Sequence, residues 1–434
     1  NAMERILASE AKNLVGQEVL LQGSLHKVRD LGGLCFGILR DRSGIIQITT
    51  EDKDSYLQKL KRESIIEVIG TVKNQEKAPD GVEVVITKLN IINEVKEDLP
   101  FEIDKNEINA NLDTILNYRC VSLRNLRNRS IFKVEAVLLK SFREFFEKNG
   151  FTEINTSKII GAATEGGTEV FKIKYFDRDA YLAQSPQFYK QMMLGTFERV
   201  YETNFVYRAE PHNTSRHLNE YISMDIEMGY INSVEDIMNI EQKYLGYAIK
   251  SIENECKQDL ERLEISLPTI PESGIPRIKF EDAQKILDEK YGQHCFGEND
   301  FEPEQEKLLG KYAKEELGSD FIFITQYKTV KRPMYTMVDP ENPELTFGFD
   351  LLFKGLEITS GAQREHRYEE LLKNIARKGL NEKDFEDYLN AFKYGLPPHG
   401  GFAIGLERLT AQFLNISNVR ETTILPRDVD RLTP

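Results

Sequence analysis

Tryptophan is absent from this chain of 434 residues, and cysteine occurs only four times. The cysteines are widely spaced and form no Cys-x-x-Cys pair, which excludes a disulfide framework. No run of about 18 apolar residues occurs, which excludes a transmembrane helix. The N-terminal part of the chain lacks a charged segment followed by an apolar run, which is the pattern of a signal peptide. These absences predict a reduced, cytoplasmic protein without a membrane partner.

Basic side chains are too few to balance the acidic ones, so the formal net charge is −14 at pH 7. Because affinity for phosphates comes from basic contacts, we expect a poor general binder of nucleic acid, and any RNA must meet a locally basic surface. The hydrophobic content of 40% and the charged content of 29% are ordinary for globular proteins and exclude a disordered or collagen-like chain. The length predicts two or three domains.

Short segments rich in β-branched residues, bounded by Gly, Asp or Pro, fill the N-terminal part of the chain. They are residues 18–23, 34–39, 44–49, 65–72 and 82–86. This pattern predicts strands. Together with a helix-like insert near residues 56–62, it favours an OB-type barrel. The predicted domain is residues 3–95, because Asn1 and Ala2 are typical of a tag remnant. Another small β barrel is the alternative.

Residues 96–125 are charged, weakly periodic and interrupted by Pro100, which is typical of a hinge or linker. Residues 126–434 mix helical and strand patterns, beginning with apolar residues at helical spacing from Ile131 to Phe145 and a glycine cap at Gly150. Further strands are predicted at residues 170–175, 199–206, 222–230, 321–325 and 345–352. Further helices are predicted at residues 243–263, 280–291, 368–377 and 407–414. Neighbouring strands favour an antiparallel sheet with flanking helices, so the fold class is α+β.

The segment of residues 207–220 concentrates charged and imidazole side chains on a predicted strand–loop–strand. They are Arg208, Glu210, His212, Arg216, His217 and Glu220. Such a loop is suited to clamping a polyphosphate, because the planar fork of arginine matches phosphate oxygens. A solvated charged hairpin is the alternative.

Two further clusters follow. An apolar strand is followed within ten residues by the polar side chains of Glu357, Ser360, Gln363, Arg364 and His366. Oxygen ligands such as Glu357 and Ser360 suit Mg²⁺ that also contacts substrate phosphates. The glycine-rich segment of residues 400–409, which ends in a predicted helix, permits close backbone approach but is a weak signal alone.

Taken together, the three clusters resemble motifs 2 and 3 of the class II aminoacyl-tRNA synthetases. They look like the aspartate, asparagine and lysine subgroup, and within it the archaeal-type aspartyl-tRNA synthetases. Residues 208–210, 360–366, 405–408 and 426–428 carry the resemblance, which extends over nearly the whole chain. It implies an N-terminal OB-type barrel that binds the anticodon of tRNA and a six-stranded antiparallel sheet that binds ATP. The implied activity is ATP-dependent attachment of L-aspartate to tRNA through aspartyl-adenylate.

The resemblance also implies roles for individual residues. The catalytic residues would be Arg208, Glu357 and Arg408. The ATP-binding residues would be Arg208, Ala209, Glu210, Arg216, His217, Leu218, Tyr221, Glu357, Gly405, Leu406, Glu407 and Arg408. Glu357 and Ser360 would hold Mg²⁺. Catalysis would depend on positioning and charge neutralisation, because a carboxylate attacking ATP needs no general base at neutral pH.

The residues implied for aspartate binding lie in several segments of the chain. They are Glu165, Gln187, Lys190, Arg208, Ser360 and Arg364. Arg364 in bidentate contact with a carboxylate would penalise the isosteric amide by roughly 1–3 kcal/mol or more, because an NH₂ group facing a guanidinium leaves donors unpaired. Surface solvation is the alternative for Lys190 and Arg364.

In the barrel, the resemblance implies anticodon contacts from His26, Phe36, Gln47 and Pro79. Phe36 would stack on the central base and Gln47 would hydrogen-bond to it, as OB folds read single-stranded RNA. Core packing is the alternative for Phe36. Local positive charge is expected from Arg29, Arg40 and Arg42. Relatives strict for the aspartate tRNA tend to have Trp at the position of His26 and Lys near Pro79, so this chain resembles relaxed members that also charge the asparagine tRNA.

The segment that resembles motif 1 of the family, residues 153–157, departs from the family pattern. Ser157 stands where the family usually has a proline that packs at the dimer interface. A homodimer is still expected. One alternative function is an asparaginyl-tRNA synthetase, against which His212 and the run 360–366 argue. The other is a non-catalytic paralogue that only binds RNA or amino acid. The presence of Arg208, Glu357 and Arg408 argues against it, because such paralogues usually lose one of these residues.

Overall fold

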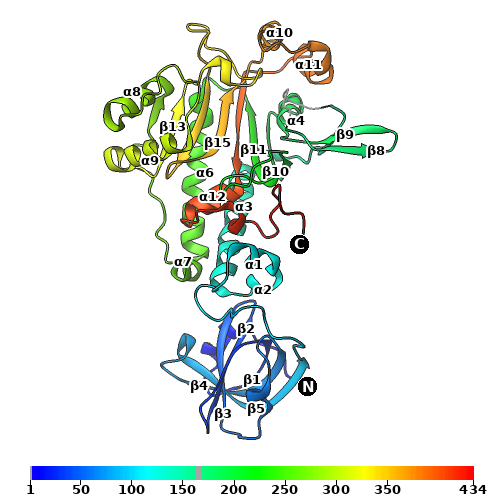
Figure 1. Cartoon of the computed structure of the whole chain (residues 1–434), viewed down its shortest axis with the longest axis vertical. Helices are drawn as coiled ribbons and strands as arrows, with labels where there is room; N and C mark the ends of the chain where they lie inside the picture. The colour runs from blue at the N-terminus through cyan, green and yellow to red at the C-terminus, as the bar shows by residue number, and fades with distance from the viewer. Residues whose placement is uncertain (1, 163–168) are drawn as a thin grey trace. The chain divides into compact units, whose positions relative to one another are not determined.

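The computed structural model describes residues 2–162 and 169–434. The chain divides into two compact units, Asn1–Leu126 and Arg127–Pro434. Within the described residues, no helix is long and apolar enough to cross a membrane. Figure 1 labels the helices and strands of both units.

The first unit is built around a closed five-stranded barrel with the strand order β1-β2-β3-β5-β4. The strands are β1 (Glu18–Asp30), β2 (Cys35–Asp41), β3 (Gly44–Thr50), β4 (Ile65–Asn74) and β5 (Val82–Asn93). Alternate residues of β4 point inward, with Ile66 and Val68 fully buried, as period-2 patterning requires. At Gly70 the register of β4 against β5 shifts, and a Cβ there would clash with the backbone of Val85. The prediction of an OB-type barrel is confirmed.

Short helices complete the first unit. They are the 3₁₀ helices η1 (Ala8–Asn13), η2 (Tyr56–Lys59) and η3 (Pro79–Gly81), and the α-helices α1 (Leu112–Asn117) and α2 (Arg119–Ser122). Both α-helices lie in the segment for which the sequence predicts a linker. Asn111 caps α1 by accepting a hydrogen bond from the backbone N–H of Thr114. Helices of six and four residues are too short to show an apolar periodicity, so the sequence pattern did not reveal them.

The second unit contains an eight-stranded sheet with the order β12-β13-β14-β15-β16-β11-β10-β6. Its strands are β6 (Thr152–Glu153), β10 (Arg199–Tyr207), β11 (Glu220–Gly229), β12 (Arg277–Lys279), β13 (Phe321–Thr325), β14 (Gly348–Phe353), β15 (Leu356–Gln363) and β16 (His399–Gly405). The six central strands are antiparallel, as the resemblance implied. The edge strands β6 and β12 each pair in parallel with their neighbours. A separate small sheet contains β7 (Ile159–Ile160), β9 (Arg178–Leu182) and β8 (Lys172–Tyr175).

Helices flank this sheet. They are α3 (Leu126–Lys148), α4 (Gln187–Met192), α5 (Leu194–Phe197), α6 (Val234–Glu255), α7 (Lys257–Leu263), α8 (Phe280–Tyr291), α9 (Pro303–Leu317), α10 (Tyr368–Arg377), α11 (Glu386–Lys393) and α12 (Leu406–Phe413), with 3₁₀ helices η4 (Thr329–Lys331), η5 (Glu382–Phe385) and η6 (Val419–Thr422). The predicted start of one helix at residue 243 is wrong. Ser233 caps α6 by accepting from the N–H of Glu235, so the helix begins nine residues earlier, at Val234.

Strand β11 shows how the sheet separates core from site. Met224 and Ile226 are fully buried and pack in the main hydrophobic core with residues of α3 and α6. Successive side chains of a strand point to opposite faces, so Ser223, Asp225 and Glu227 point to the other face. This face of β11 therefore carries a row of polar side chains.

Candidate functional site

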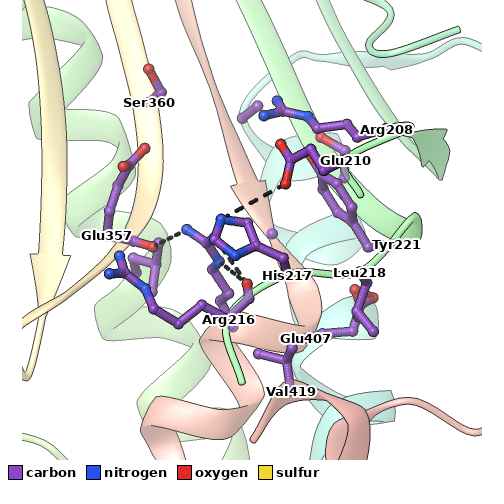
Figure 2. Close-up of a pocket in the computed structure, with 15 residues that line it drawn as sticks. Arg208, Glu210, Arg216, His217, Leu218, Tyr221, Glu357, Ser360, Glu407 and Val419 are labelled. Atoms are coloured by element: carbon purple, nitrogen blue, oxygen red, sulfur yellow. Dashed lines mark hydrogen bonds and ion pairs between the residues drawn. The ribbon is translucent and has the colours of Figure 1, made fainter. Parts of the chain in front are cut away.

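A hollow lies on the polar face of the sheet and receives side chains from β11, β15, β16, α12 and the connection between β10 and β11. It is lined by Arg208, Glu210, Arg216, His217, Leu218, Tyr221, Ser223, Glu357, Ile358, Ser360, Ala403, Gly405, Glu407, Arg408 and Val419. In Figure 2, Glu357 and Ser360 lie across the hollow from Arg208, Glu210 and Tyr221, with His217 between them. The structure thus brings together residues from all three clusters that the sequence singled out.

The connection between β10 and β11 contributes both charge and an aromatic ring. The guanidinium of Arg208 lies 5.8 Å from the ring centroid of Tyr221. His217 Nε2 lies 3.8 Å from Glu210 Oε2. Burial lowers the pKa of His217 to about 4, and the nearby charges of Arg408 and Arg216 act in the same direction. At neutral pH, His217 is therefore an uncharged polar group beside the arginines, whereas Arg208 and residues 211–215 of the same segment are exposed.

Helix α12 supplies Arg408 and Glu407, whose side chains make different kinds of hydrogen bond to the backbone. The Arg408 guanidinium donates to the backbone oxygens of Arg216, at 2.9 and 3.1 Å, and of Glu357, at 3.1 Å. It therefore ties the two sides of the hollow together. The carboxylate of Glu407 accepts the backbone N–H of Ile222 at 2.9 Å, and burial raises the pKa of Glu407 to about 8.

Two residues predicted to bind ATP do not line the hollow. Leu406 is buried in the hydrophobic core and is not among the residues lining the hollow. Ala209 lines a neighbouring depression, next to the C-terminal residues from Arg427 to Leu432. Gly405 lines the hollow, as predicted.

Carboxylates gather where β14 and β15 form a hairpin. Asp350 pairs with Ser360 in the strand register, and both contact Arg332, at 2.8 Å from Asp350 Oδ1 and 2.9 Å from Ser360 Oγ. Burial, and after it the charge of Asp350, raises the pKa of Glu357 to about 8. Two carboxylates that repel each other in a buried place favour a cation between them. Asp350 was not predicted as a site residue, although it lies seven residues before Glu357, on the paired strand.

These residues fit a magnesium ion. The described part of the chain contains no group of three or more His, Cys, Asp or Glu that could hold a metal ion by itself. Mg²⁺, however, typically takes one or two protein carboxylates and fills its other positions with water and substrate phosphates. Glu357 and Asp350, with the hydroxyl of Ser360, provide such a partial set.

Two of the residues predicted to bind aspartate, Lys190 and Arg364, lie in a second, buried group with Asp225 and Glu227, which we call the aspartate cluster. Lys190 is 1% exposed, and its Nζ lies 3.0 Å from Asp225 Oδ1 and 3.2 Å from Glu227 Oε1. Arg364 is 4% exposed, and it donates from Nη2 and Nε to the two carboxylate oxygens of Glu227, at 3.0 and 3.3 Å. The alternative of surface solvation is therefore wrong for both cations.

Glu227 is the centre of this cluster. Burial acts to raise its pKa, but the charges of Arg364 and Lys190 lower it overall. A Cβ at Gly401 would clash with the carboxylate of Glu227, so the glycine-rich segment provides the space for this side chain. Ser223, which lines the hollow, donates from its hydroxyl to Asp225, the partner of Lys190, so the cluster adjoins the hollow.

Gln187 is buried on α4, and its Nε2 donates to Gln191 Oε1 at 2.9 Å. Ser360 lines the hollow and is exposed, as a ligand-binding hydroxyl requires. Glu165 lies outside the described residues. Asp225, Glu227 and Gln191 were not predicted as site residues, because each is an ordinary polar residue within a strand or helix pattern.

A separate hollow lies on the surface of the barrel. It is lined by Lys27, Arg29, Leu31, Phe36, Gly37, Ile38, Gln47, Gln75 and Lys77. Phe36 is only partly buried, so the alternative of core packing does not describe it. The Gln47 amide donates to Glu83 Oε2 at 2.8 Å. A ring, an amide and three cations thus share one surface.

His26 and Pro79 are not among the residues lining the barrel hollow. His26 is 5% exposed, and its Nδ1 lies 2.9 Å from Nη1 of Arg40. Arg40 is also buried, and its guanidinium donates to both carboxylate oxygens of Glu63 at 2.9 and 2.6 Å. The expectation that Arg40 provides surface charge is therefore wrong, since it forms a buried ion pair, whereas Arg29 does line the hollow.

Comparisons with known proteins agree with this geometry. Residues 111–429 match the family described as tRNA synthetases class II (D, K and N), and residues 19–92 match the OB-fold nucleic acid binding domain. The chain is 48% identical to the aspartate–tRNA(Asp/Asn) ligase of Thermus thermophilus, covering 99% of this chain and all of the relative. It is 44% identical to the aspartate–tRNA(Asp) ligase of Pyrococcus furiosus, covering 98% of each.

Among solved structures, the chain resembles asparaginyl-tRNA synthetase from Pyrococcus horikoshii complexed with asparaginyl-adenylate. The TM-score is 0.92 at 31% identity, and all of both chains is covered.

Proposed function

The chain belongs to the class II tRNA synthetases of the aspartate, lysine and asparagine group, and from this premise we propose that it is an aspartate–tRNA ligase. The predictions of the family and of the fold class are thereby confirmed. The enzyme joins L-aspartate to ATP, forming aspartyl-adenylate and pyrophosphate, and then transfers the aspartyl group to the terminal ribose of tRNA.

One observation carries the choice of aspartate, namely the burial of Lys190 and Arg364 around Glu227. The two bonds from Arg364 to Glu227 use Nε and Nη2, so the N–H groups of Nη1 lie on another edge of the guanidinium. A second carboxylate is well matched to these donors, whereas the NH₂ group of an amide would face them with donors of its own. Aspartate is therefore favoured over asparagine.

The hollow on the sheet is suited to ATP. Arg208 would bind the α-phosphate, Arg408 would neutralise phosphate charge, and the ring of Tyr221 offers a flat apolar surface for the base. Bound Mg²⁺, held by Glu357, Asp350 and Ser360, would neutralise phosphate charge. The α-carboxylate of aspartate attacks the α-phosphorus, a P–O bond forms, and pyrophosphate leaves with the electron pair. Positioning and charge neutralisation drive this step, so no nucleophilic side chain is needed.

Exchange of labelled pyrophosphate into ATP, measured with each of the twenty amino acids, tests this function. We expect aspartate to support exchange far better than any other amino acid. Preferential exchange with asparagine would establish the second candidate, an asparaginyl-tRNA synthetase, which the resemblance to the solved asparaginyl enzyme favours. Exchange with no amino acid would indicate the non-catalytic alternative.

We propose that the barrel hollow binds the anticodon, with Phe36 stacking on a base and Gln47 hydrogen-bonding to it. Charging of both the aspartate and the asparagine tRNA is proposed as well, and the relative from Thermus named for both tRNAs supports it. Because His26 is buried against Arg40, its effect on specificity would act through the shape of the barrel. Pro79 and His26 stay predictions as anticodon-binding residues.

Aminoacylation of the two purified tRNAs with aspartate tests the relaxed specificity. Their anticodons, GUC and GUU, differ at the third base, and a good base contact discriminates by about 1–3 kcal/mol. Comparable charging is expected. If the asparagine tRNA is charged more than about a hundredfold less efficiently, near the limit of such a contact, the enzyme is discriminating.

The homodimer and the cytoplasmic location also stay predictions, and sedimentation of the purified protein tests the homodimer.

A further inference from the structure

A chain of buried hydrogen bonds begins at Gln187, next to the aspartate cluster. Gln187 Nε2 donates to Gln191 Oε1 at 2.9 Å, one helical turn along α4. The Tyr388 hydroxyl of α11 donates to the same oxygen at 2.8 Å. The amide of Gln191 is therefore oriented with its oxygen toward Gln187 and Tyr388. Its Nε2, which can only donate, faces His399 Nε2 at 2.9 Å.

His399 ends the chain in a single state. Its Nδ1 lies 2.8 Å from the backbone oxygen of Pro397, an acceptor, so Nδ1 must carry the ring proton. Nε2 must then be unprotonated to accept from Gln191. The residue is 0% exposed. Burial lowers the pKa of His399 to about 4, which agrees with a neutral ring at neutral pH.

His399 also connects to the other side of the aspartate cluster. Its backbone oxygen accepts the N–H of Arg364 at 2.8 Å. The next residues on β16 include Gly401, which leaves room for Glu227. One residue thus links Arg364 through its backbone and Gln187 through its side chain and Gln191.

We propose that His399 and Gln191 are positioning residues for aspartate, which hold the amide of Gln187 in one of its two orientations. The fixed orientation directs Nε2 of Gln187 to Gln191 and turns its carbonyl oxygen the other way. That oxygen is an acceptor, suited to an ammonium group and not to a carboxylate. An amide free to flip would present either an acceptor or a donor, and the donor orientation would oppose an ammonium group. This proposal rests on the assignment of the protein as an aspartate–tRNA ligase.

Two substitutions at His399 separate orientation from mere packing. His399→Asn keeps a donor near the position of Nδ1 but removes the acceptor that Gln191 requires. His399→Gln places an amide oxygen near the position of Nε2 and so can restore that acceptor. We expect His399→Asn to raise the KM for aspartate about tenfold or more in the pyrophosphate-exchange assay, with little change in kcat or in the KM for ATP. His399→Gln should return the KM for aspartate to within about threefold of the parent protein.

Tyr388→Phe provides a second test that does not depend on the folding of the His399 variants. Removing one hydroxyl leaves Gln191 Oε1 with Gln187 as its donor, so a smaller rise of about three- to fivefold in the KM for aspartate is expected. His294→Asn and Tyr394→Phe are matched controls, because both side chains are exposed. Thermal unfolding of each variant reports on stability separately.

The inference is overturned if His399→Asn and Tyr388→Phe leave the KM for aspartate unchanged. It is also overturned if they raise the KM values for aspartate and ATP equally, because a general distortion of the active site does that. The parent protein is assayed first. If it shows no aspartate-dependent exchange, the proposed function fails, whereas normal exchange with unaffected variants rejects the positioning role alone.

Discussion

The barrel hollow and the aspartate cluster both carry cations, but they hold them in opposite ways. In the barrel, Lys27, Arg29 and Lys77 line an open surface beside Phe36. On the sheet, Lys190 and Arg364 are almost completely buried and are balanced by Asp225 and Glu227. Solvent-exposed cations attract a flexible polyanion in many binding geometries, whereas buried cations paired with carboxylates are already oriented before the ligand binds.

This difference also makes the acidic composition compatible with binding of RNA. The chain has a net charge of −14, and a small basic surface on the barrel is enough to meet a single-stranded loop. The buried cations add nothing to that surface, because carboxylates neutralise them. Arg40 inside the barrel belongs to the same buried class, since Glu63 pairs with it.

The largest effect is expected from Arg364→Ala. The substitution removes the guanidinium and leaves Glu227 facing Lys190 alone in a buried site. Truncating one partner of a buried, hydrogen-bonded charge pair costs about 2–5 kcal/mol of binding, so without the guanidinium that would pair with the substrate carboxylate, kcat/KM for aspartate in pyrophosphate exchange should fall by about a thousandfold. Arg367→Ala is the control, because this nearby arginine pairs with Glu365 and is half exposed. Equal effects of the two substitutions would contradict a special role for the buried cation.

Glu357→Gln tests the carboxylate pair on the β14–β15 hairpin. The substitution keeps the shape but removes one of the two charges that would hold Mg²⁺. Adenylate formation should fall by about a hundredfold, and the Mg²⁺ concentration needed for half-maximal exchange should rise. Glu344→Gln, at an exposed position, should have no effect. Near-normal turnover with unchanged Mg²⁺ dependence would exclude Glu357 from metal binding.

Phe36→Ala tests whether the barrel hollow acts on tRNA alone. A base stacked on an aromatic ring contributes about 1–3 kcal/mol, so kcat/KM for tRNA should fall about tenfold or more. Pyrophosphate exchange without tRNA should stay unchanged, because the ring lies on the barrel. Tyr56→Ala is a control, since this exposed aromatic of the barrel does not line the hollow. Loss of exchange activity in Phe36→Ala would mean that the two units do not act separately.

The smallest effect is one on stability. Burial raises the pKa of Glu241 to about 8 from its ordinary value of 4.5, and its carboxyl meets the hydroxyl of Thr359. The folded protein therefore keeps a proton that the unfolded chain releases. Rising pH between 4.5 and about 8 then destabilises the fold, and this cost is absent below 4.5.

Glu241→Gln mimics the protonated carboxyl at every pH. The gain in melting temperature should be larger at pH 8.5 than at pH 5.5, by about 3 °C or more. Glu253→Gln, on the exposed side of the same helix, should show no such difference between the two pH values. An equal shift at both pH values would show that Glu241 is already ionised in the folded protein.

Local patterns were sufficient for many elements. Strand β13 occurs at the predicted residues, Phe321–Thr325, because a short apolar run that is too brief for a helix favours a buried strand. Helices α8 and α10 also match their predicted residues. The 15-residue helix α9 was missed, because its charged residues interrupt the apolar stripe.

Residue types and their local spacing are enough to predict the family, the α+β class, the barrel and the charged residues of the three clusters. The burial of particular cations, and the carboxylates that face them, depend instead on how distant segments pack. Lys190, Glu227 and Arg364 come from a helix, a strand and the end of another strand, and their pairing depends on strand order and register. The burial of His26 and the link from His399 to Gln187 were decided in the same way, because long-range packing, and not local spacing, sets the partner of a buried polar group.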